Sequence, residues 1–171
     1  KRQILKSEVL ITEEETGESL HDKLAAAGAA LCVETLEALE DGTAVFEHQG
    51  ESPTPYAKML HKKMGNIDWS QPAVQIERLV RGLNSWPSAY THWGDKVLKI
   101  WRAKAVPQEE KACTAAPGTV LEVGKDCFTV QTGEGILRIS ELQIPGKKRM
   151  ETSAFLRGYT LETGTLFTCG S

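Results

Sequence analysis

The pattern of apolar residues in the first third of the chain predicts one strand followed by one long helix. Ile4 to Ile11 has the composition of a strand, and the Glu and Thr residues after it are typical of a turn. Leucines and alanines then recur at helical spacing between the N-cap candidates of residues 16–19 and a stop at Asp41-Gly42. A strand and an amphipathic helix must each bury an apolar face against another layer. Residues 1–46 are therefore expected to be the carboxyl-terminal remnant of a larger α/β domain.

Residues 47–66 mix proline, glycine and charge without a sustained period, which indicates a linker. A second helix is expected after this linker, with Ser70 as its N-cap candidate and Pro72 early in the first turn. Its apolar positions form one core-facing stripe that consists of Ile76, Leu79, Val80 and Leu83.

The remainder of the chain changes from a helical period to short strands separated by glycine-containing turns. The expected strands are 89–93, 97–106, 118–123, 128–132 and 136–144, followed by a short helix at 151–158. Closely spaced strands after one helix suit a small open barrel of the OB type, a common nucleic-acid-binding fold. The expected fold is mostly β with helices, and residues 67–171 form the OB-like domain.

The net charge of −3 is an average of two unlike segments. Residues 1–55 contain four basic and twelve acidic side chains, a net charge of −8. The other 16 basic and 11 acidic residues lie in 56–171 and give +5. This asymmetry favours a polyanionic partner for the second segment. No apolar run is long enough to cross a membrane, so no membrane partner is expected.

Cysteine and histidine residues do not form a metal or disulfide pattern. The four cysteines are far apart and lack a Cys-x-x-Cys pair, which favours reduced thiols in a cytoplasmic protein. The four histidines lack the spacing that chelates a metal. We therefore expect no metal.

The candidate contacts to a polyanion are basic residues of the second segment. They comprise Lys147, Lys148, Arg149, Arg78, Arg81, Lys99, Arg102 and Lys104. The cluster at 147–149 follows the Pro145-Gly146 turn, where an RNA contact and a solvated turn are both open readings. An alanine change at all three is expected to weaken RNA binding and leave the fold intact, since turn positions are exposed.

The other candidates also have two readings. Glu77 precedes Arg81 by one helical turn, so a surface ion pair competes with an RNA contact. Strand alternation puts Arg102 and Lys104 on one face together with Lys96, and puts Lys99 on the other. The four tryptophans could stack on unpaired bases, although tryptophan in a small barrel is more often part of the core. They are Trp69, Trp86, Trp93 and Trp101.

Several segments in order along the chain resemble the carboxyl-terminal region of the methionyl-tRNA formyltransferase family. They are Tyr56 to Leu60, Asn66 to Ser70, Gln75 to Pro87, Ala116 to Val120, Gly133 to Leu137 and Leu142 to Met150. Ser85 departs from the proline expected between Asn84 and Trp86. Formyltransferases that act on nucleotide sugars share the Ile-Asp-Trp element, but residues 84–87 are more similar to the tRNA enzymes.

The resemblance implies a two-domain enzyme. Its amino-terminal Rossmann-like domain binds the co-substrate 10-formyltetrahydrofolate, and its OB-like barrel helps to hold initiator methionyl-tRNA while a formyl group moves to the methionine α-amine. The Asn, His and Asp that organise this transfer in the family have no motif match here, so no catalytic residue and no bound cofactor are assigned. The chain is expected to be inactive alone, and to be a cytoplasmic monomer that does not bind DNA.

Two alternatives remain open from the sequence. The chain could be part of a sugar-nucleotide formyltransferase, in which case the basic residues are merely solvated. It could also be a stand-alone OB-type RNA-binding protein.

Overall fold

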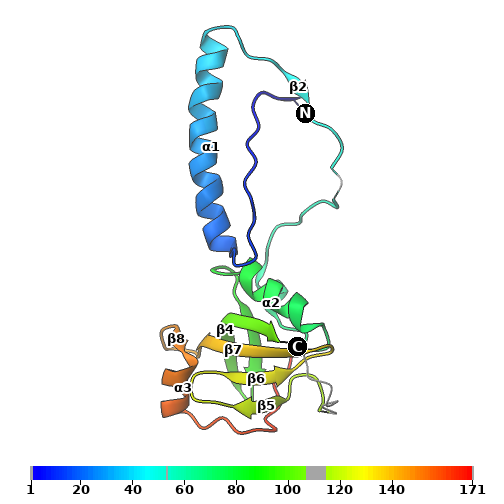
Figure 1. Ribbon diagram of the computed structural model, residues 1–171, viewed down its shortest axis with the longest axis vertical. Helices are drawn as coiled ribbons and strands as arrows, with labels where there is room; N and C mark the ends of the chain where they lie inside the picture. The colour runs from blue at the N-terminus through cyan, green and yellow to red at the C-terminus, as the bar shows by residue number, and fades with distance from the viewer. Residues whose placement is uncertain (1, 53, 107–114, 171) are drawn as a thin grey trace. The chain divides into compact units, whose positions relative to one another are not determined.

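The computed structural model describes residues 2–52, 54–106 and 115–170. It divides into two compact units, Lys1–Met59 and Leu60–Ser171, and each is described by itself. Figure 1 shows the elements of both units.

The first unit consists mainly of helix α1 (Gly17–Glu40). Thr16 caps its N-terminus through a reciprocal capping box with Ser19, and Asp41 is the C-cap, as the sequence predicts. The carboxylate of Glu15 accepts hydrogen bonds from Ser19 and Lys23 beside this cap. No residue of α1 is buried: Leu24, Val33, Leu36 and Leu39 are exposed, and Leu20 and Leu31 are half-buried. The unit thus leaves its apolar helix face uncovered.

The expected strand at 4–11 is wrong. Strand β1 covers only Arg2–Gln3, which pairs antiparallel with β2 (Glu47–His48). A strand is stabilised by a hydrogen-bonded neighbour, and in the described part of the chain the following residues have none. Composition alone therefore misidentified this segment.

The second unit begins with the 3₁₀ turn η1 (Lys62–Gly65) and helix α2 (Ala73–Gly82). Ser70 does not cap α2, because its hydroxyl and its N–H both donate to Asp68 Oδ1, at 2.6 and 3.0 Å. These bonds and one from Gln71 hold the pKa of Asp68 below its usual value. Pro72 takes the N-cap position without a side-chain bond. The predicted apolar stripe of α2 packs into the core.

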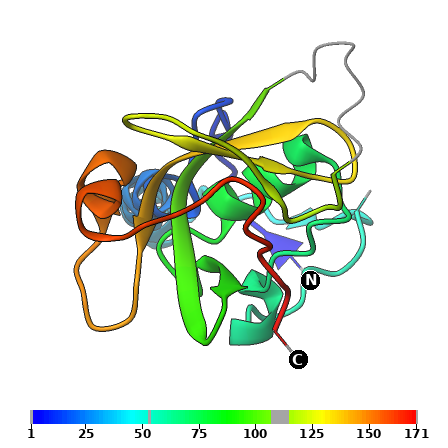
Figure 2. The same ribbon diagram turned by 90° about the horizontal axis from the view of Figure 1, so that it is seen from below.

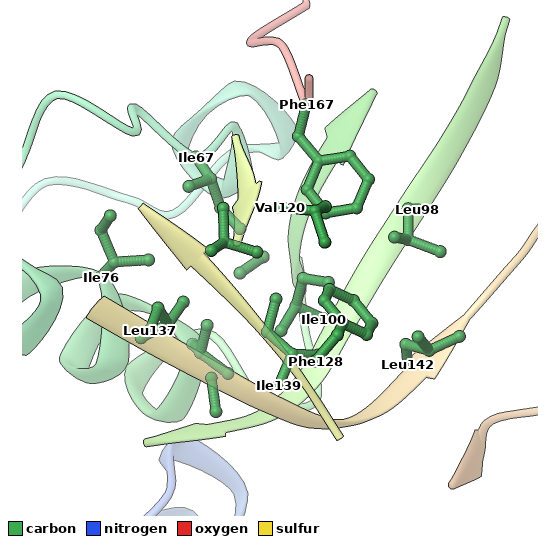
Figure 3. Packing of buried hydrophobic residues seen from close by; sticks show 14 of the residues in the cluster. Ile67, Ile76, Leu98, Ile100, Val120, Phe128, Leu137, Ile139, Leu142 and Phe167 are labelled. Carbon is green, nitrogen blue, oxygen red and sulfur yellow. The ribbon is translucent and has the colours of Figure 1, made fainter. Parts of the chain in front are cut away.

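The sheet of the second unit is antiparallel, in the order β3-β4-β7-β6-β5, with β8 paired to β7. Its strands are β3 (Ala89–Trp93), β4 (Lys96–Val106), β5 (Val120–Val123), β6 (Phe128–Gln131), β7 (Ile136–Gln143) and β8 (Met150–Glu151). Helix α3 (Thr152–Gly158) follows, close to its predicted position. Within the described residues, the fold is mostly sheet with three α-helices, and the sheet runs from β3 to β5 without closing into a barrel. Figure 3 shows how residues of α2 and of the strands meet in one apolar core.

The C-terminal segment after α3 joins the two edges of this sheet, a feature the sequence analysis missed. Thr168 exchanges backbone hydrogen bonds with His92 of β3, at 2.9 and 3.0 Å. Phe167 donates to the carbonyl of Gly118, and Val120 of β5 donates to Thr165, both at 2.8 Å. Figure 2 follows this segment, drawn in red, from α3 to the C-terminus. The segment satisfies backbone groups on both edge strands without forming a strand itself.

Candidate functional site

Three of the predicted basic residues lie on the outer face of β4. The pairing of β4 with β7 is irregular between Ile100 and Ala103, so the alternation of buried and exposed residues shifts by one position there. Lys99 therefore lies on the same side as Arg102 and Lys104, and the expected opposite placement is wrong. Lys96 instead lies at the hairpin end, where its ammonium is 5.5 Å from the ring centres of both Trp93 and Tyr159.

A buried carboxylate holds two of the candidate arginines together. Glu141 of β7 is 8% exposed and accepts two hydrogen bonds from Arg149, one of them 2.6 Å from Nη2 to Oε2. Arg102 Nη2 lies 3.4 Å from Glu141 Oε2, and Arg102 Nη1 lies 3.8 Å from Glu151 Oε1. The bonds from Arg149 hold the pKa of Glu141 below its usual value, although burial opposes this. Arg149 and Arg102 thus have a structural role.

A second buried carboxylate links α2 to β4. Glu77 Oε2 accepts the N–H of Ala105 at 2.7 Å, and Glu77 Oε1 lies 3.2 Å from Lys104 Nζ and 3.8 Å from Arg81 Nε. The expected Glu77–Arg81 pair is therefore present, but Glu77 is buried and also fixes the helix to the strand. A charge at this position costs free energy unless it is paired, and these three contacts pair it.

Four of the eight candidates lack an acidic partner at ion-pair distance within the described ranges. They are Lys99, Lys147, Lys148 and Arg78. Both lysines of the turn are exposed, and Lys147 N–H donates to Ile144 O at 3.2 Å. A cation without an acidic neighbour can contact a phosphate without sharing or breaking an existing ion pair. These four are the best candidates for contacts to a polyanion.

Side-chain bonds connect the 147–149 turn to the face of β4. Trp101 Nε1 donates to Gln143 Oε1 at 3.1 Å, and Gln143 Nε2 donates to Lys147 O at 2.8 Å. The Arg149 guanidinium lies 5.0 Å from the Trp101 ring centre. Lys99 pairs with Gln143 across the strands. Lys99 and the turn lysines thus belong to one surface, which we call the β4–β7 basic surface and define as Lys99, Lys147 and Lys148.

Trp69 and Trp93 belong to the core or pack against it, as the core interpretation suggests, whereas Trp86 and Trp101 do not. Trp69 is buried and its Nε1 donates to Thr91, while Trp93 contacts Phe155 and Tyr159. Trp101 is covered by Arg149. Trp86, in the loop between α2 and β3, is 55% exposed. It is the tryptophan best placed to contact a ligand.

The burial of Glu77 and Glu141 was not predicted from the sequence. Glu77 is adjacent in sequence to the apolar stripe of α2, and this adjacency was the available signal. Glu141 has no such signal. The alternation of inward and outward side chains along β7 changes at the irregular pairing with β4, which lies at Glu141 itself. Among the described residues, no group of His, Cys, Asp and Glu side chains could hold a metal, and no helix is long and apolar enough to span a membrane.

Of the three basic residues of the turn, Arg149 binds a buried carboxylate, whereas Lys147 and Lys148 are exposed. We expect Arg149→Ala to lower the free energy of unfolding by about 1–2 kcal/mol, because it removes charged hydrogen bonds from a buried carboxylate but is itself partly exposed. The double change Lys147→Ala/Lys148→Ala is expected to alter it by less than about 0.5 kcal/mol. Urea denaturation followed by tryptophan fluorescence measures both. Equal stability of the two variants would contradict this division.

The lowered pKa of Glu141 predicts a pH dependence of stability. The carboxylate form is favoured in the folded state, so its stabilisation is present above the ordinary value of 4.5 and is lost as the pH falls through the lower folded value. We expect Glu141→Gln to be less stable than the parent protein by about 1–2 kcal/mol at pH 7, with a difference that shrinks below pH 4.5. Glu151→Gln, at an exposed ion pair, is the control and should cost about 0–1 kcal/mol. A difference that stays constant down to pH 3 would sink this assignment.

Comparison with known proteins gives one family and a consistent set of relatives. The model described as "Formyl transferase, C-terminal domain" matches residues 59–160. A methionyl-tRNA formyltransferase of Agathobacter rectalis is 49% identical over 96% of this chain and 52% of its own length. One of Clostridioides difficile is 44% identical over 94% of this chain and 51% of its own length. The chain spans about half the length of the curated relatives it matches.

A more distant likeness is found among solved structures. A HypX variant from Aquifex aeolicus matches with a TM-score of 0.58 and 22% identity, over 87% of this chain and 27% of that one. HypX from the same organism in complex with tetrahydrofolic acid matches with a TM-score of 0.51 and 21% identity, over 74% of this chain and 22% of that one. At this level of identity the likeness concerns the fold alone.

Proposed function

Because this chain belongs to the formyl transferase C-terminal domain family, we propose that it binds and positions initiator methionyl-tRNA for a formyltransferase. The enzyme moves a formyl group from 10-formyltetrahydrofolate to the α-amine of the tRNA-bound methionine. The observation that carries this proposal is the identity of 49% across nearly the whole chain with a methionyl-tRNA formyltransferase. The family's Asn, His and Asp set has no motif match in this chain, so none of its residues is assigned a step of the transfer.

The β4–β7 basic surface supports an RNA-binding role. Lysines that neutralise phosphates release counterions, a contribution that depends on salt and little on sequence. Paired RNA is recognised largely through its backbone and shape, for which exposed lysines on a sheet face are suited. Arg78 on α2 adds a further exposed cation. Arg81, Arg102, Lys104 and Arg149 contribute mainly by holding the fold that presents these charges.

We further propose the domain layout of the longer enzyme. Residues 1–46 are the last part of its Rossmann-like catalytic domain, 47–66 are a linker, and 67–171 are an OB-like barrel. The uncovered apolar side chains of α1 support the first assignment, since such a face is stable only against another layer. The joining of both sheet edges by the C-terminal segment supports the last. The protein is a cytoplasmic monomer, and this chain alone transfers no formyl group.

Binding of initiator methionyl-tRNA at several salt concentrations tests the proposal. We expect log K to fall linearly with log salt, and the slope to shrink by about 2 units in Lys147→Ala/Lys148→Ala, close to one per lost phosphate contact. Lys125→Ala, in the turn between β5 and β6 at the other edge of the sheet, is the matched control and should leave the slope unchanged. Absent binding, or binding that salt does not weaken, would overturn the proposal.

A further inference from the structure

A cavity of about 520 Å³ opens on the second unit and shares Lys99 with the β4–β7 basic surface. Its walls come from η1, from the loop between α2 and β3, and from β3 and β4, with lining residues that include Lys62, Trp86, Tyr90, His92, Lys99 and Trp101. This volume lies within the range of about 300–1,000 Å³ that small-molecule sites occupy. Aromatic rings and two lysines thus meet in one hollow.

Among the aromatic side chains that line this cavity, Trp86 is the most exposed. It is 55% exposed, whereas Trp101 is held by a hydrogen bond to Gln143 and by the guanidinium of Arg149. Tyr90 packs edge-on against His92, with ring centres 6.0 Å apart. An exposed indole costs free energy in water, and a flat ligand that stacks on it recovers part of that cost.

The cations of the cavity favour an anionic ligand. Lys62 is exposed and Lys99 is half-buried, and neither has an acidic partner at ion-pair distance among the residues that the structure describes. No acidic side chain is among the described residues that line the cavity. A ring to stack on and nearby free ammonium groups match the two parts of a nucleotide, its base and its phosphate.

We propose that this cavity binds one unpaired nucleotide of the bound RNA, with its base stacked on Trp86 and its phosphate held by Lys99 and Lys62. The inference rests on the proposed function, since it assigns a subsite for the same RNA. It differs from the β4–β7 basic surface in what it recognises. The basic surface contacts phosphates of paired or unpaired strands alike, whereas the cavity requires a base that is free to stack.

Two RNA probes and four variants test the proposal. The probes are a short oligoadenylate, which offers unpaired bases, and a blunt-ended RNA duplex, which offers phosphates only. We expect Trp86→Ala to weaken oligoadenylate binding about fivefold to a hundredfold, the range of one lost base–aromatic stack. Trp86→Phe should keep most of the affinity because it retains a ring. Leu166→Ala, at another exposed apolar residue, is the matched control and should change nothing. Duplex binding should be the same in all of these variants.

The fourth variant and a folding measurement separate the possible outcomes. Lys99→Ala should weaken oligoadenylate binding and reduce its salt slope by about 0.7, the value for one single-strand phosphate contact. Thermal unfolding of each variant identifies any loss of the folded state, and Trp86→Phe keeps the test valid if Trp86→Ala does not fold. Equal effects of Trp86→Ala on both probes, no effect on either, or no oligoadenylate binding by the parent chain would overturn the subsite.

Failure of the subsite and failure of the proposed function give different results. Salt-dependent binding of initiator tRNA without any effect of Trp86→Ala on oligoadenylate removes the subsite and leaves the proposed function. No binding of initiator tRNA, together with oligoadenylate binding that depends on Trp86, removes the proposed function and leaves a nucleotide site. Binding of a protein at Trp86, with neither RNA probe bound there, would count against the subsite.

Discussion

Replacing Phe167 by alanine is expected to lower the free energy of unfolding of the second unit by about 3–5 kcal/mol, the usual cost of removing a buried phenylalanine. Phe167 is 1% exposed, and its ring centre lies 6.1 Å from that of Trp69 and 5.9 Å from that of Phe128. The change opens a cavity in the core and removes aromatic contacts. It also loosens the segment that joins the sheet edges.

The backbone around Phe167 explains why the effect reaches both edges of the sheet. Phe167 donates to Gly118 O at 2.8 Å, and its neighbour Thr168 exchanges two bonds with His92. Gly118 has φ +92°, and a Cβ there would lie 2.4 Å from Phe167 O. The buried ring therefore fixes the register of a segment that has no ladder of its own. Without the ring, backbone groups of β3 and of the start of β5 lose their partners.

Urea denaturation followed by tryptophan fluorescence measures this effect, because all four tryptophans lie in the second unit. Leu166→Ala is the matched control: Leu166 is the preceding residue and is 51% exposed, so its loss should cost less than about 0.5 kcal/mol. Phe167→Leu should cost less than Phe167→Ala, since it leaves a smaller cavity. Similar stability of Phe167→Ala and Leu166→Ala would show that the segment does not hold the edges.

The strands of the second unit were predictable because the alternation of apolar residues and the positions of the glycine turns indicate the same strand ends. Alternation and the breaks at 124–126 and 133–135 placed β5, β6 and β7 within a few residues of their observed bounds. The stripe of α2 was predicted for the same reason. In each case the local pattern and the tertiary packing require the same residues inside, so the sequence is sufficient.

The features that the sequence missed depend on contacts between distant residues. The face of Lys99 changed because β4 and β7 pair irregularly, and a period of two cannot reveal where a pairing shifts. The segment at 164–168 has no periodicity, since its two neighbours come from opposite edges of the sheet. Glu141 looks like a surface residue until Arg149 and Arg102 are placed beside it. The sequence therefore predicted which basic residues belong to the candidate site. It could not predict which of them form ion pairs with acidic side chains and which do not.

Gly133→Ala is expected to destabilise the second unit by at least about 3 kcal/mol, at the upper end of what overpacking costs, because the added atom meets backbone. A Cβ at Gly133 would lie 1.8 Å from Ser70 O and 2.6 Å from its carbonyl carbon. Gly133 N–H also donates to Trp69 O and Gln71 O, at 2.9 and 3.1 Å. The turn after β6 is therefore docked on the residues that lead into α2, and neither side can move without breaking these bonds.

The same turn holds the start of α2 from its other side. Ala73 N–H, the first of the helix, donates to Glu134 O at 2.8 Å, which satisfies a backbone group that the helix itself leaves unpaired. A shift forced by a methyl group at Gly133 would separate this pair as well. The residues that enter α2 also carry buried Trp69. We therefore expect the tryptophan fluorescence of Gly133→Ala to differ from that of the parent protein even before denaturant is added.

Gly82→Ala is the matched control for this prediction. Gly82 is the last residue of α2, and apart from its chain neighbours and the backbone of its own helix an added Cβ there meets no atom within 4 Å. Alanine should therefore stabilise the unit by about 0.5–1 kcal/mol through its higher helix propensity. The two changes are expected to have opposite signs because the added Cβ meets backbone at Gly133, whereas Gly82 is a helical position with room for it. If Gly133→Ala were as stable as the parent protein, the turn would have to move away from Ser70 at no cost. The inference that the turn is fixed against the residues leading into α2 would then be wrong.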